Sequence, residues 1–152
     1  AKGQALMDAS IGSAFQVANH VFVRGLISLV LARSSGQATF QSIADKSIER
    51  MKSWSEHAPS NFQHKLLLLQ AEYSFLLGKS KDAAEKYEMA IEKAGKNGFI
   101  HEKAIAFELA GIFYRAEGNV SKATQLYGQA HDTYLQWGAK GKADHLRLNC
   151  PF

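Results

Sequence analysis

Apolar residues recur at helical spacing along most of the chain, and no segment has the alternation of apolar and polar residues that is typical of a strand. The pattern predicts a series of helices joined by short turns. Their expected ranges are about 13–33, 38–57, 61–77, 80–96, 100–117, 120–137 and a short polar cap at 139–148. In the first range, apolar residues lie on more than one side, which predicts a buried helix. The sequence therefore predicts an all-α protein.

Two segments forty residues apart, with Leu67 aligned to Phe107, share one pattern of small and aromatic residues. The later copy consists of Phe107, Ala110, Gly111, Tyr114, Gly118, Ala123, Tyr127 and Ala130. The earlier copy consists of Leu67, Ala71, Gly78, Ala83, Tyr87 and Ala90. This spacing is similar to that of the tetratricopeptide repeat, a helix-turn-helix unit that stacks into a solenoid, although its usual period is about 34 residues. We expect a tetratricopeptide-like solenoid of antiparallel helix hairpins.

The small residues of the pattern have a packing role. Gly111 and Ala123 have almost no side chain, so their helices can approach to the short end of the usual range of about 8–10 Å. Gly118 suits the left-handed cap that ends a helix. Ser74 stands where the later copy has Tyr114, and we expect Tyr73 or Phe75 to fill that space.

The first helix pair fits the pattern poorly. Phe40 stands where the second pair has Ala83, so we expect these two helices to lie farther apart or to cross differently. Pro59 ends the second helix, and Ser60 followed by Gln63 predicts a capping box for the third.

One domain of about three helix pairs accounts for the 152 residues. The expected parts are a divergent first pair at 13–57, a second pair at 60–96, a third pair at 99–138 and a cap and tail at 139–152. The chain does not begin with Met, and we expect it to be an excerpt of a longer protein.

Composition narrows the class of protein. Apolar residues at 46% and charged residues at 21% are ordinary for a folded protein. The net charge of +4 comes from basic and acidic residues that are interleaved, which does not predict a nucleic-acid surface. The single Cys150 forms no internal disulfide and fits a reducing, cytoplasmic compartment. Polar residues interrupt the apolar run at 15–31, which favours a buried helix over a membrane span.

The residues that could carry chemistry are scattered. The six histidines (His20, His57, His64, His101, His131 and His145) never have the spacing that places two imidazoles on one helix face. No glycine-rich phosphate loop is present, and Glu85, Glu88 and Glu92 follow a solvated face. We therefore expect no metal site, no cofactor, no catalytic residue and no enzyme activity from this chain.

A binding surface is the remaining expectation. Matching the repeat residue by residue implies a concave groove lined by the first helix of each pair. The groove residues implied are Lys65, Leu68, Glu72, Phe75, Leu76, Ile105, Glu108, Ile112, Arg115 and Ala116. Its polar members would orient a bound protein segment. The alternative is that these residues face only solvent or packed neighbours.

Three strings resemble a larger family: MKSWSEHAPSNFQHK at 51–65, NGFIHE at 97–102 and YLQWGAK at 134–140. Over about residues 14 to 146, the chain is similar to the helical repeat region that follows the AAA-type ATPase in very large multidomain sensor histidine kinases. That family also carries a serine/threonine-kinase-like domain, a GAF sensor domain and a histidine kinase. The resemblance implies a non-catalytic connector in signal transduction, with neighbouring domains as partners.

The sequence thus predicts an interaction scaffold that binds a protein segment or a neighbouring domain. The alternative is a module that holds a small molecule or nucleic acid on its concave face, although the aromatic residues have the spacing of a helical core and a nucleic-acid partner is not favoured. Because the helix at 13–33 is apolar on several sides, we also expect the fragment to self-associate.

Overall fold

The computed structural model describes residues 2–150 and 152, with side chains described for residue 13, residues 15–150 and residue 152. Within these limits every regular element is a helix, so the all-α prediction is confirmed. The helices are α1 (Lys2–Ser35), α2 (Ala38–His57), α3 (Pro59–Leu76), α4 (Ser80–Lys96), α5 (Ile100–Ala116), α6 (Val120–Trp137) and α7 (Lys140–Asn149).

Most helix ends follow the sequence signals. Gly78 and Gly118 have φ angles of 74° and 85°, and the amide after each glycine bonds back to the preceding helix, as in Asn119 N to Tyr114 O at 2.9 Å. The start of α3 differs from the prediction, because no side chain caps it and Ser60 already lies inside the helix. Pro59 occupies the first turn instead, where its missing N–H costs nothing. Helix α1 begins at Lys2 rather than at about residue 13.

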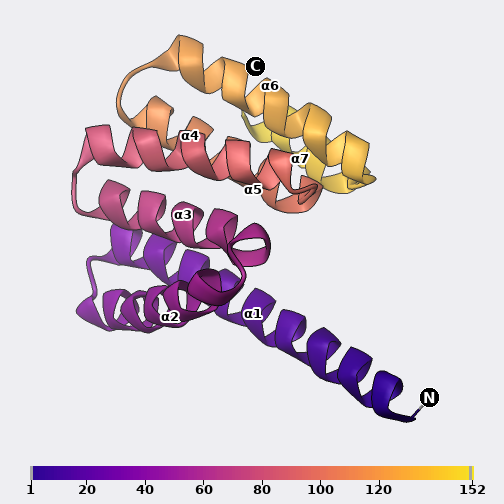
Figure 1. The fold of residues 1–152 in the computed structure, drawn as a ribbon. Helices are drawn as coiled ribbons and strands as arrows, with labels where there is room; N and C mark the ends of the chain where they lie inside the picture. Colours follow the sequence, from indigo (N-terminus) through magenta and orange to yellow (C-terminus); the bar gives the residue numbers. More distant parts are fainter. Residues whose placement is uncertain (1, 151) are drawn as a thin grey trace.

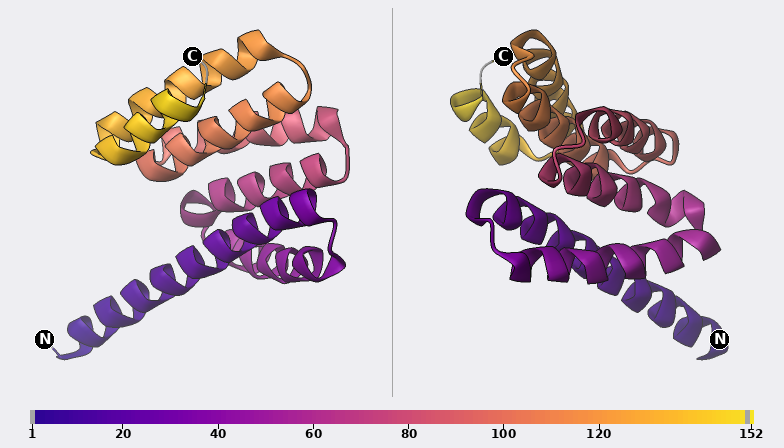
Figure 2. Two further views of the ribbon diagram at one scale, coloured as in Figure 1. Left: turned by 180° about the vertical axis from the view of Figure 1, so that it is seen from behind. Right: turned by 90° about the vertical axis from the view of Figure 1, so that its left-hand side faces the viewer.

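The helices form consecutive hairpins stacked one on the next (Figures 1 and 2). Helix α3 contacts α1 on one side and α5 on the other, and the even-numbered helices α2 and α4 each contact the odd-numbered helices next to them. In the described part of the chain, the backbones of α2 and α4 do not approach each other directly, nor do those of α4 and α6. Helix α7 packs on α6 at the end of the stack opposite α1 (Figure 1).

The third pair shows why a glycine is needed between helices. A Cβ added at Gly111 would lie 2.7 Å from the Tyr127 ring, closer than van der Waals contact allows. The sequence placed Ala123 opposite Gly111, but the nearest side-chain atoms all belong to Tyr127. Ala123 is nevertheless buried. The absence of a side chain at Gly111 therefore leaves the space that the Tyr127 ring occupies.

The first pair has its close contact at a different place. A Cβ added at Gly25 would lie 2.9 Å from Ser47 Cβ and 2.8 Å from Leu69 Cδ2, so α1, α2 and α3 meet tightly there. Phe40 is only half-buried and does not hold the helices apart. The expected wide separation is wrong at this point, because Gly25 and Ser47 supply the small residues in place of those that the repeat pattern uses.

Helix α1 is buried on one side only. Ala18, Phe22, Leu26 and Leu29 are buried, whereas other apolar side chains of this helix remain exposed. The exposed ones are Phe15, Val17, Val23, Ile27, Val30 and Leu31. The segment Phe15–Ser35 also has the length and mean hydropathy (1.4) of a membrane span, with 44% of it buried, a test that core helices of soluble proteins pass as well. The prediction of a buried helix holds for one face.

Candidate binding cavity between α2 and α4

Three residues predicted to line an open groove lie inside the stack instead. Lys65, Leu68 and Glu72 are 5%, 1% and 1% exposed. All three are on α3, which has neighbouring helices on both sides, so positions that would face a partner face α1 and α5. Their assignment to an open groove is wrong.

Glu72 is the centre of a buried polar contact. Its Oε2 accepts a hydrogen bond from Arg33 Nη1 of α1 at 2.9 Å and another from the Tyr87 hydroxyl of α4 at 2.8 Å. Burial raises the pKa of Glu72, and the charge of Arg33 acts in the opposite direction. Burial, then the neighbouring Glu72, also raises the pKa of Tyr87, so its hydroxyl stays a donor. The carboxylate holds three helices together.

Lys65 makes the matching contact on the other side of α3. Its Nζ lies 2.7 Å from Glu102 Oε1 of α5 and 3.3 Å from His64 Nε2. Burial favours the neutral form of Glu102, but the hydrogen bond and charge of Lys65 outweigh it and lower the pKa of this carboxyl. Burial, followed by the charge of Lys65, lowers the pKa of His64 to about 4. His64 also stacks on Phe99 with ring centroids 4.2 Å apart.

A third ion pair continues this series, because Lys142 Nζ of α7 lies 2.8 Å from Glu108 Oε1 of α5. Each odd-numbered helix is thus tied to the next one by a single ion pair. Sequence reasoning assigned Lys65, Glu72 and Glu108 to partner recognition, whereas the structure places each of them in an ion pair between two helices. The position of a charged residue within its own helix does not show whether another helix packs over it, so the sequence pattern could not predict these ion pairs.

The remaining predicted groove residues are more open. Phe75 is half-buried, packs edge-on against Phe113 at 5.3 Å and has the Arg33 guanidinium over its ring at 4.1 Å. Ile112 is 36% exposed, and Arg115 is exposed. Leu76 and Ile105 are half-buried and Ala116 is exposed. These residues are thus more accessible than Lys65, Leu68 and Glu72.

The repeat positions behave as packing residues. Tyr114 is half-buried, and Gly78 and Gly118 adopt the left-handed conformation described above. The other repeat positions are buried: Ala71, Ala83, Tyr87, Ala90, Phe107, Ala110, Gly111, Ala123, Tyr127 and Ala130, as is Leu67.

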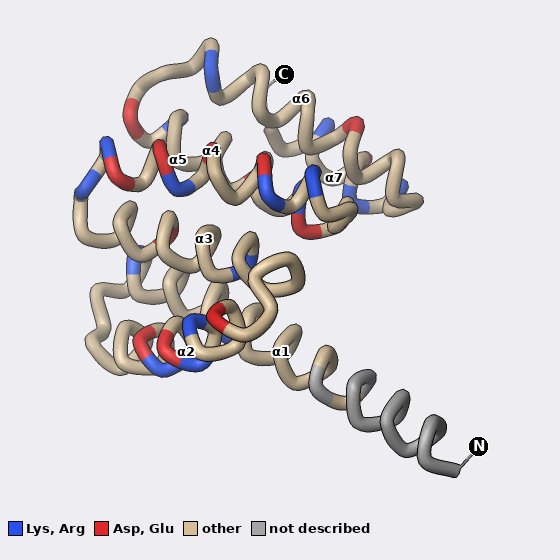
Figure 3. Tube along the Cα trace, in the orientation of Figure 1, with Lys and Arg blue, Asp and Glu red and all other residues tan. Residues whose placement is uncertain are grey.

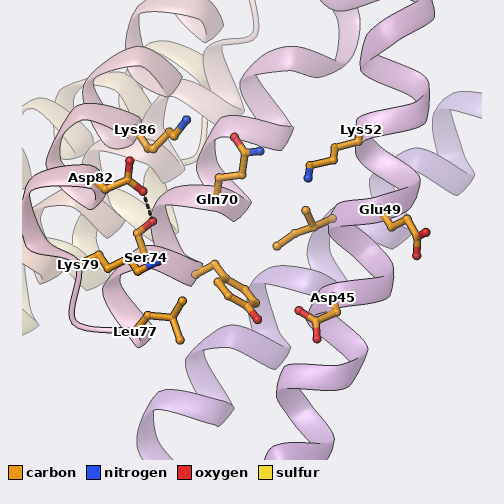
Figure 4. Close-up of a pocket in the computed structure, with 11 residues that line it drawn as sticks. Asp45, Glu49, Lys52, Gln70, Ser74, Leu77, Lys79, Asp82 and Lys86 are labelled. Atoms are coloured by element: carbon orange, nitrogen blue, oxygen red, sulfur yellow. Dashed lines mark hydrogen bonds between the residues drawn. The ribbon is translucent and has the colours of Figure 1, made fainter.

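A cavity of about 630 Å³ lies between α2 and α4, and α3 forms its floor (Figure 4). We call it the α2–α4 cavity. The corresponding space between α4 and α6 measures about 230 Å³ and has Tyr114 in its wall. At the equivalent position the α2–α4 cavity has Ser74. The smaller side chain at this position leaves room that the Tyr114 ring occupies in the α4–α6 cavity.

The expectation that Tyr73 or Phe75 fills this space is wrong. Tyr73 lines the cavity without closing it, and its hydroxyl accepts a hydrogen bond from Gln41 Nε2 at 2.9 Å. Phe75 packs against Phe113 of α5. Tyr73 is held by Gln41 of α2 and Phe75 by Phe113 of α5. The spacing of residues within α3 could not predict these two contacts.

Charged side chains of both signs line the α2–α4 cavity. Helix α2 contributes Asp45, Glu49 and Lys52, and the opposite wall contributes Lys79, Asp82 and Lys86 (Figure 4). Asp82 accepts a hydrogen bond from Ser74 Oγ at 2.5 Å. Among the described side chains, none forms an ion pair with the other five charged residues of the cavity. These five charges are free to meet a ligand.

Two apolar side chains and one amide complete the lining. Leu77 is 46% exposed and Ile48 is half-buried, and both border the cavity. Gln70 lies on the floor between the two charged walls (Figure 4). The cavity can therefore offer charge pairing, an apolar contact and an amide that donates and accepts hydrogen bonds.

Metal chemistry finds no support in the described residues, where no three His, Cys, Asp or Glu side chains are grouped to hold an ion. The six histidines include two that stack on aromatic rings, His64 on Phe99 and His101 on Trp137, each with ring centroids 4.2 Å apart.

Comparison with known proteins assigns no family to this chain. No family model, no curated protein and no solved structure matches it.

Proposed function

We propose that this chain is a tetratricopeptide-like scaffold that does no chemistry and binds a protein segment in the α2–α4 cavity. The observation that carries the proposal is Ser74. It stands where Tyr114 narrows the next cavity, and it leaves an open space lined by unpaired charges from both walls.

Support for the solenoid comes from the agreement between two hairpins. The pairs α3/α4 and α5/α6 end their first helices with Gly78 and Gly118 in the same conformation, and both bury a tyrosine of the second helix, Tyr87 or Tyr127. Helices α1, α3 and α5 lie side by side, as the first helices of successive pairs do in a repeat array.

A protein segment suits the cavity better than a small molecule. Small-molecule sites are mostly apolar and enclosed, whereas this cavity carries six charged side chains and opens to solvent along two helices. A nucleic acid would meet the carboxylates of Asp45, Glu49 and Asp82 with its phosphates. A segment with both charge signs and one apolar anchor, to contact Leu77 and Ile48, complements the lining.

The setting of the scaffold rests on the sequence resemblance. We propose that the segment belongs to a signal-transduction protein in the cytoplasm, either a neighbouring domain of the same chain or a separate partner. In that setting the helices would connect a nucleotide switch to a sensor-kinase module.

Peptide selection tests the proposal directly. Peptides selected from a displayed random library on this chain are labelled, and their affinities are measured by fluorescence anisotropy. Ser74→Tyr restores the ring that narrows the neighbouring cavity, and we expect it to weaken binding at least about tenfold, or about 1.4 kcal/mol. Ser121→Tyr adds the same ring at an exposed position on α6 and should leave the affinity unchanged.

A charge swap sharpens the result. Lys86→Glu should weaken a peptide that places a carboxylate on this wall, and exchanging that carboxylate for lysine should restore binding. If every selected peptide binds the Ser74→Tyr variant as well as the wild type, the cavity is not the site. A saturable rise in melting temperature with a nucleotide, a lipid or a short RNA, lost in the Ser74→Tyr variant, would support the alternative ligand classes.

A further inference from the structure

Helix α1 presents an aliphatic face to solvent. Val23, Ile27, Val30 and Leu31 are 41%, 55%, 38% and 39% exposed, and their spacing places them on one side of the helix. We call them the outer face of α1. Phe22, Leu26 and Leu29 point the other way and are buried against the stack. The outer face is therefore turned away from α2 and α3.

The outer face is also almost uncharged. From residue 13 to residue 35 the only charged residues are Arg24 and Arg33, so few positions of α1 are coloured as charged in Figure 3. Arg33 is paired with Glu72 of α3. Only Arg24 borders the face. A strongly charged partner would find little to pair with here, so the face is suited to an apolar partner surface.

The opposite end of the stack is closed. The side chains of Lys140, Asp144, His145 and Arg147 on α7 are exposed, and Leu148 is the one strongly exposed apolar residue among the described residues of that helix. Among the described helices the exposed aliphatic face lies at the α1 side of the stack, so two copies of this chain that pair through it form a closed dimer.

We propose that the outer face of α1 binds a second copy of this chain, with the two α1 helices antiparallel and crossing at Ile27. In that arrangement Ile27 meets its counterpart, and Val23 of each copy faces Leu31 of the other. His20 faces Ser34, so polar residues also meet polar residues. Val30 faces Arg24 of the other copy, whose aliphatic stem can pack against it while the guanidinium reaches solvent. At the other positions of the outer face, apolar residues meet apolar residues when the helix is reversed.

The same arrangement separates the positive charges. Arg24 of the two copies lie six positions apart along the axis, or about 9 Å at about 1.5 Å per residue, in addition to the distance between the helices. One helix pair buries less than the roughly 800 Å² per partner of a standard interface, so the dimer is expected to dissociate in the micromolar range.

Sedimentation velocity of the full chain from about 1 to about 300 µM, a range around the expected micromolar dissociation constant, tests the proposal. We expect a monomer–dimer equilibrium in the wild type. Ile27→Glu should raise the dissociation constant at least about tenfold, and Ile27→Ser should raise it less. Leu148→Glu at the closed end, where the side chain is 84% exposed, is the matched control and should leave the equilibrium unchanged.

Cross-linking tests the orientation. In a Cys150→Ser background, Ile27→Cys should form a disulfide between copies when copper phenanthroline is the oxidant. Gln16→Cys, an exposed position on the same side of the helix as Ile27, should not, because the two positions would lie 22 residues apart, about 33 Å along the axis. Cross-linking at both positions would indicate parallel helices and overturn the arrangement. A monomer at every concentration, a dimer insensitive to Ile27→Glu, or monomers that float with lipid vesicles would overturn the proposal.

The two proposals can fail separately. Ile27 is not among the residues that line the α2–α4 cavity, so Ile27→Glu should leave peptide affinity unchanged, and Ser74→Tyr should leave the dimer intact. Circular dichroism of each variant confirms that the helices remain folded.

Discussion

The two ends of the stack are built differently. Helix α1 presents exposed aliphatic residues and is joined to α3 by the Arg33–Glu72 pair, whose carboxylate side chain is only 1% exposed. Helix α7 presents polar residues and is joined to α5 by the Lys142–Glu108 pair, whose ammonium side chain is 41% exposed. At the α1 end, the ion pair is largely buried and the outer helix face is apolar and exposed. At the α7 end, the ion pair is partly exposed and the outer helix face is mainly polar.

The difference shows how a small helical stack can end. A hairpin cannot bury its apolar side alone, so each terminal helix needs either a polar outer face or a further partner. Helix α7 meets the first condition, with Ala143 and Leu146 buried and the rest polar or exposed. Helix α1 does not, which is why its outer face is a candidate interface.

The largest expected difference in stability is between loss of the Arg33–Glu72 ion pair and loss of the Lys142–Glu108 ion pair. Glu72→Ala removes a buried carboxylate and leaves the Tyr87 hydroxyl without its acceptor, so the free energy of unfolding should fall by about 3 kcal/mol. Lys142→Ala removes an exposed partner and should cost less than about 1 kcal/mol. Urea denaturation of both variants measures the difference, and equal losses would show that the two ends are held alike.

Acid should destabilise the stack through His64, which lies on α3. The pKa of His64 is about 4 when folded and 6.5 when exposed, so the unfolded chain binds more protons between these values and stability falls as the pH falls. From pH 7 to pH 5 the expected loss is about 2 kcal/mol. Glu102, whose folded pKa is lowered, adds a loss in the same direction below pH 4.5.

The variant His64→Phe keeps an aromatic ring against Phe99 and removes the titrating group. Its urea midpoint should change little between pH 7 and pH 5, while that of the wild type falls. A wild-type midpoint that does not change over this range would contradict the assignment.

Glycines at the two ends should respond in opposite directions. At the α1 end, Gly25→Ala pushes a methyl group into Ser47 and Leu69, and overpacking should outweigh the better helix propensity by about 1 kcal/mol. The second change Ser47→Gly removes the closest fixed atom, Ser47 Cβ, and should recover part of the loss. Thermal and urea unfolding measure both variants, and a stabilised Gly25→Ala would show that α1 and α2 do not meet tightly.

The smallest effect is expected at the closed end. Gly141→Ala in α7 adds a methyl group with no atom within 4 Å, so it should raise the free energy of unfolding by roughly 0.5 kcal/mol through helix propensity and a less flexible unfolded chain. Urea denaturation beside the wild type detects the shift. A loss of stability would indicate that α7 is packed more closely than its exposure suggests.

Much of the helical framework could be predicted, because its signals are local. The periodicity of apolar residues predicted each helix from α2 to α6 within a few residues, and Gly78 and Gly118 marked turns that the structure contains. Ser60 was misread as a cap because Pro59, one residue earlier, can itself begin a helix.

The candidate site could be predicted only in part. The substitution of Ser74 for the tyrosine of the later copy was visible in the sequence, and this position is where the cavity opens. Its consequence was missed, because Tyr73 and Phe75 are held by Gln41 and Phe113, which belong to other helices.

By itself the sequence determined the bounds of α2 to α6 within a few residues, the need for a small residue at Gly111, and the position at which a ring is missing. These properties depend on neighbours within a turn or two of the chain. Only the tertiary structure decided that Lys65 and Glu72 are buried ties and that the outer face of α1 is left uncovered. A charged side chain can be buried only where a residue from another helix pairs with it. Because that residue is distant in the sequence, the spacing within one helix does not predict the pair.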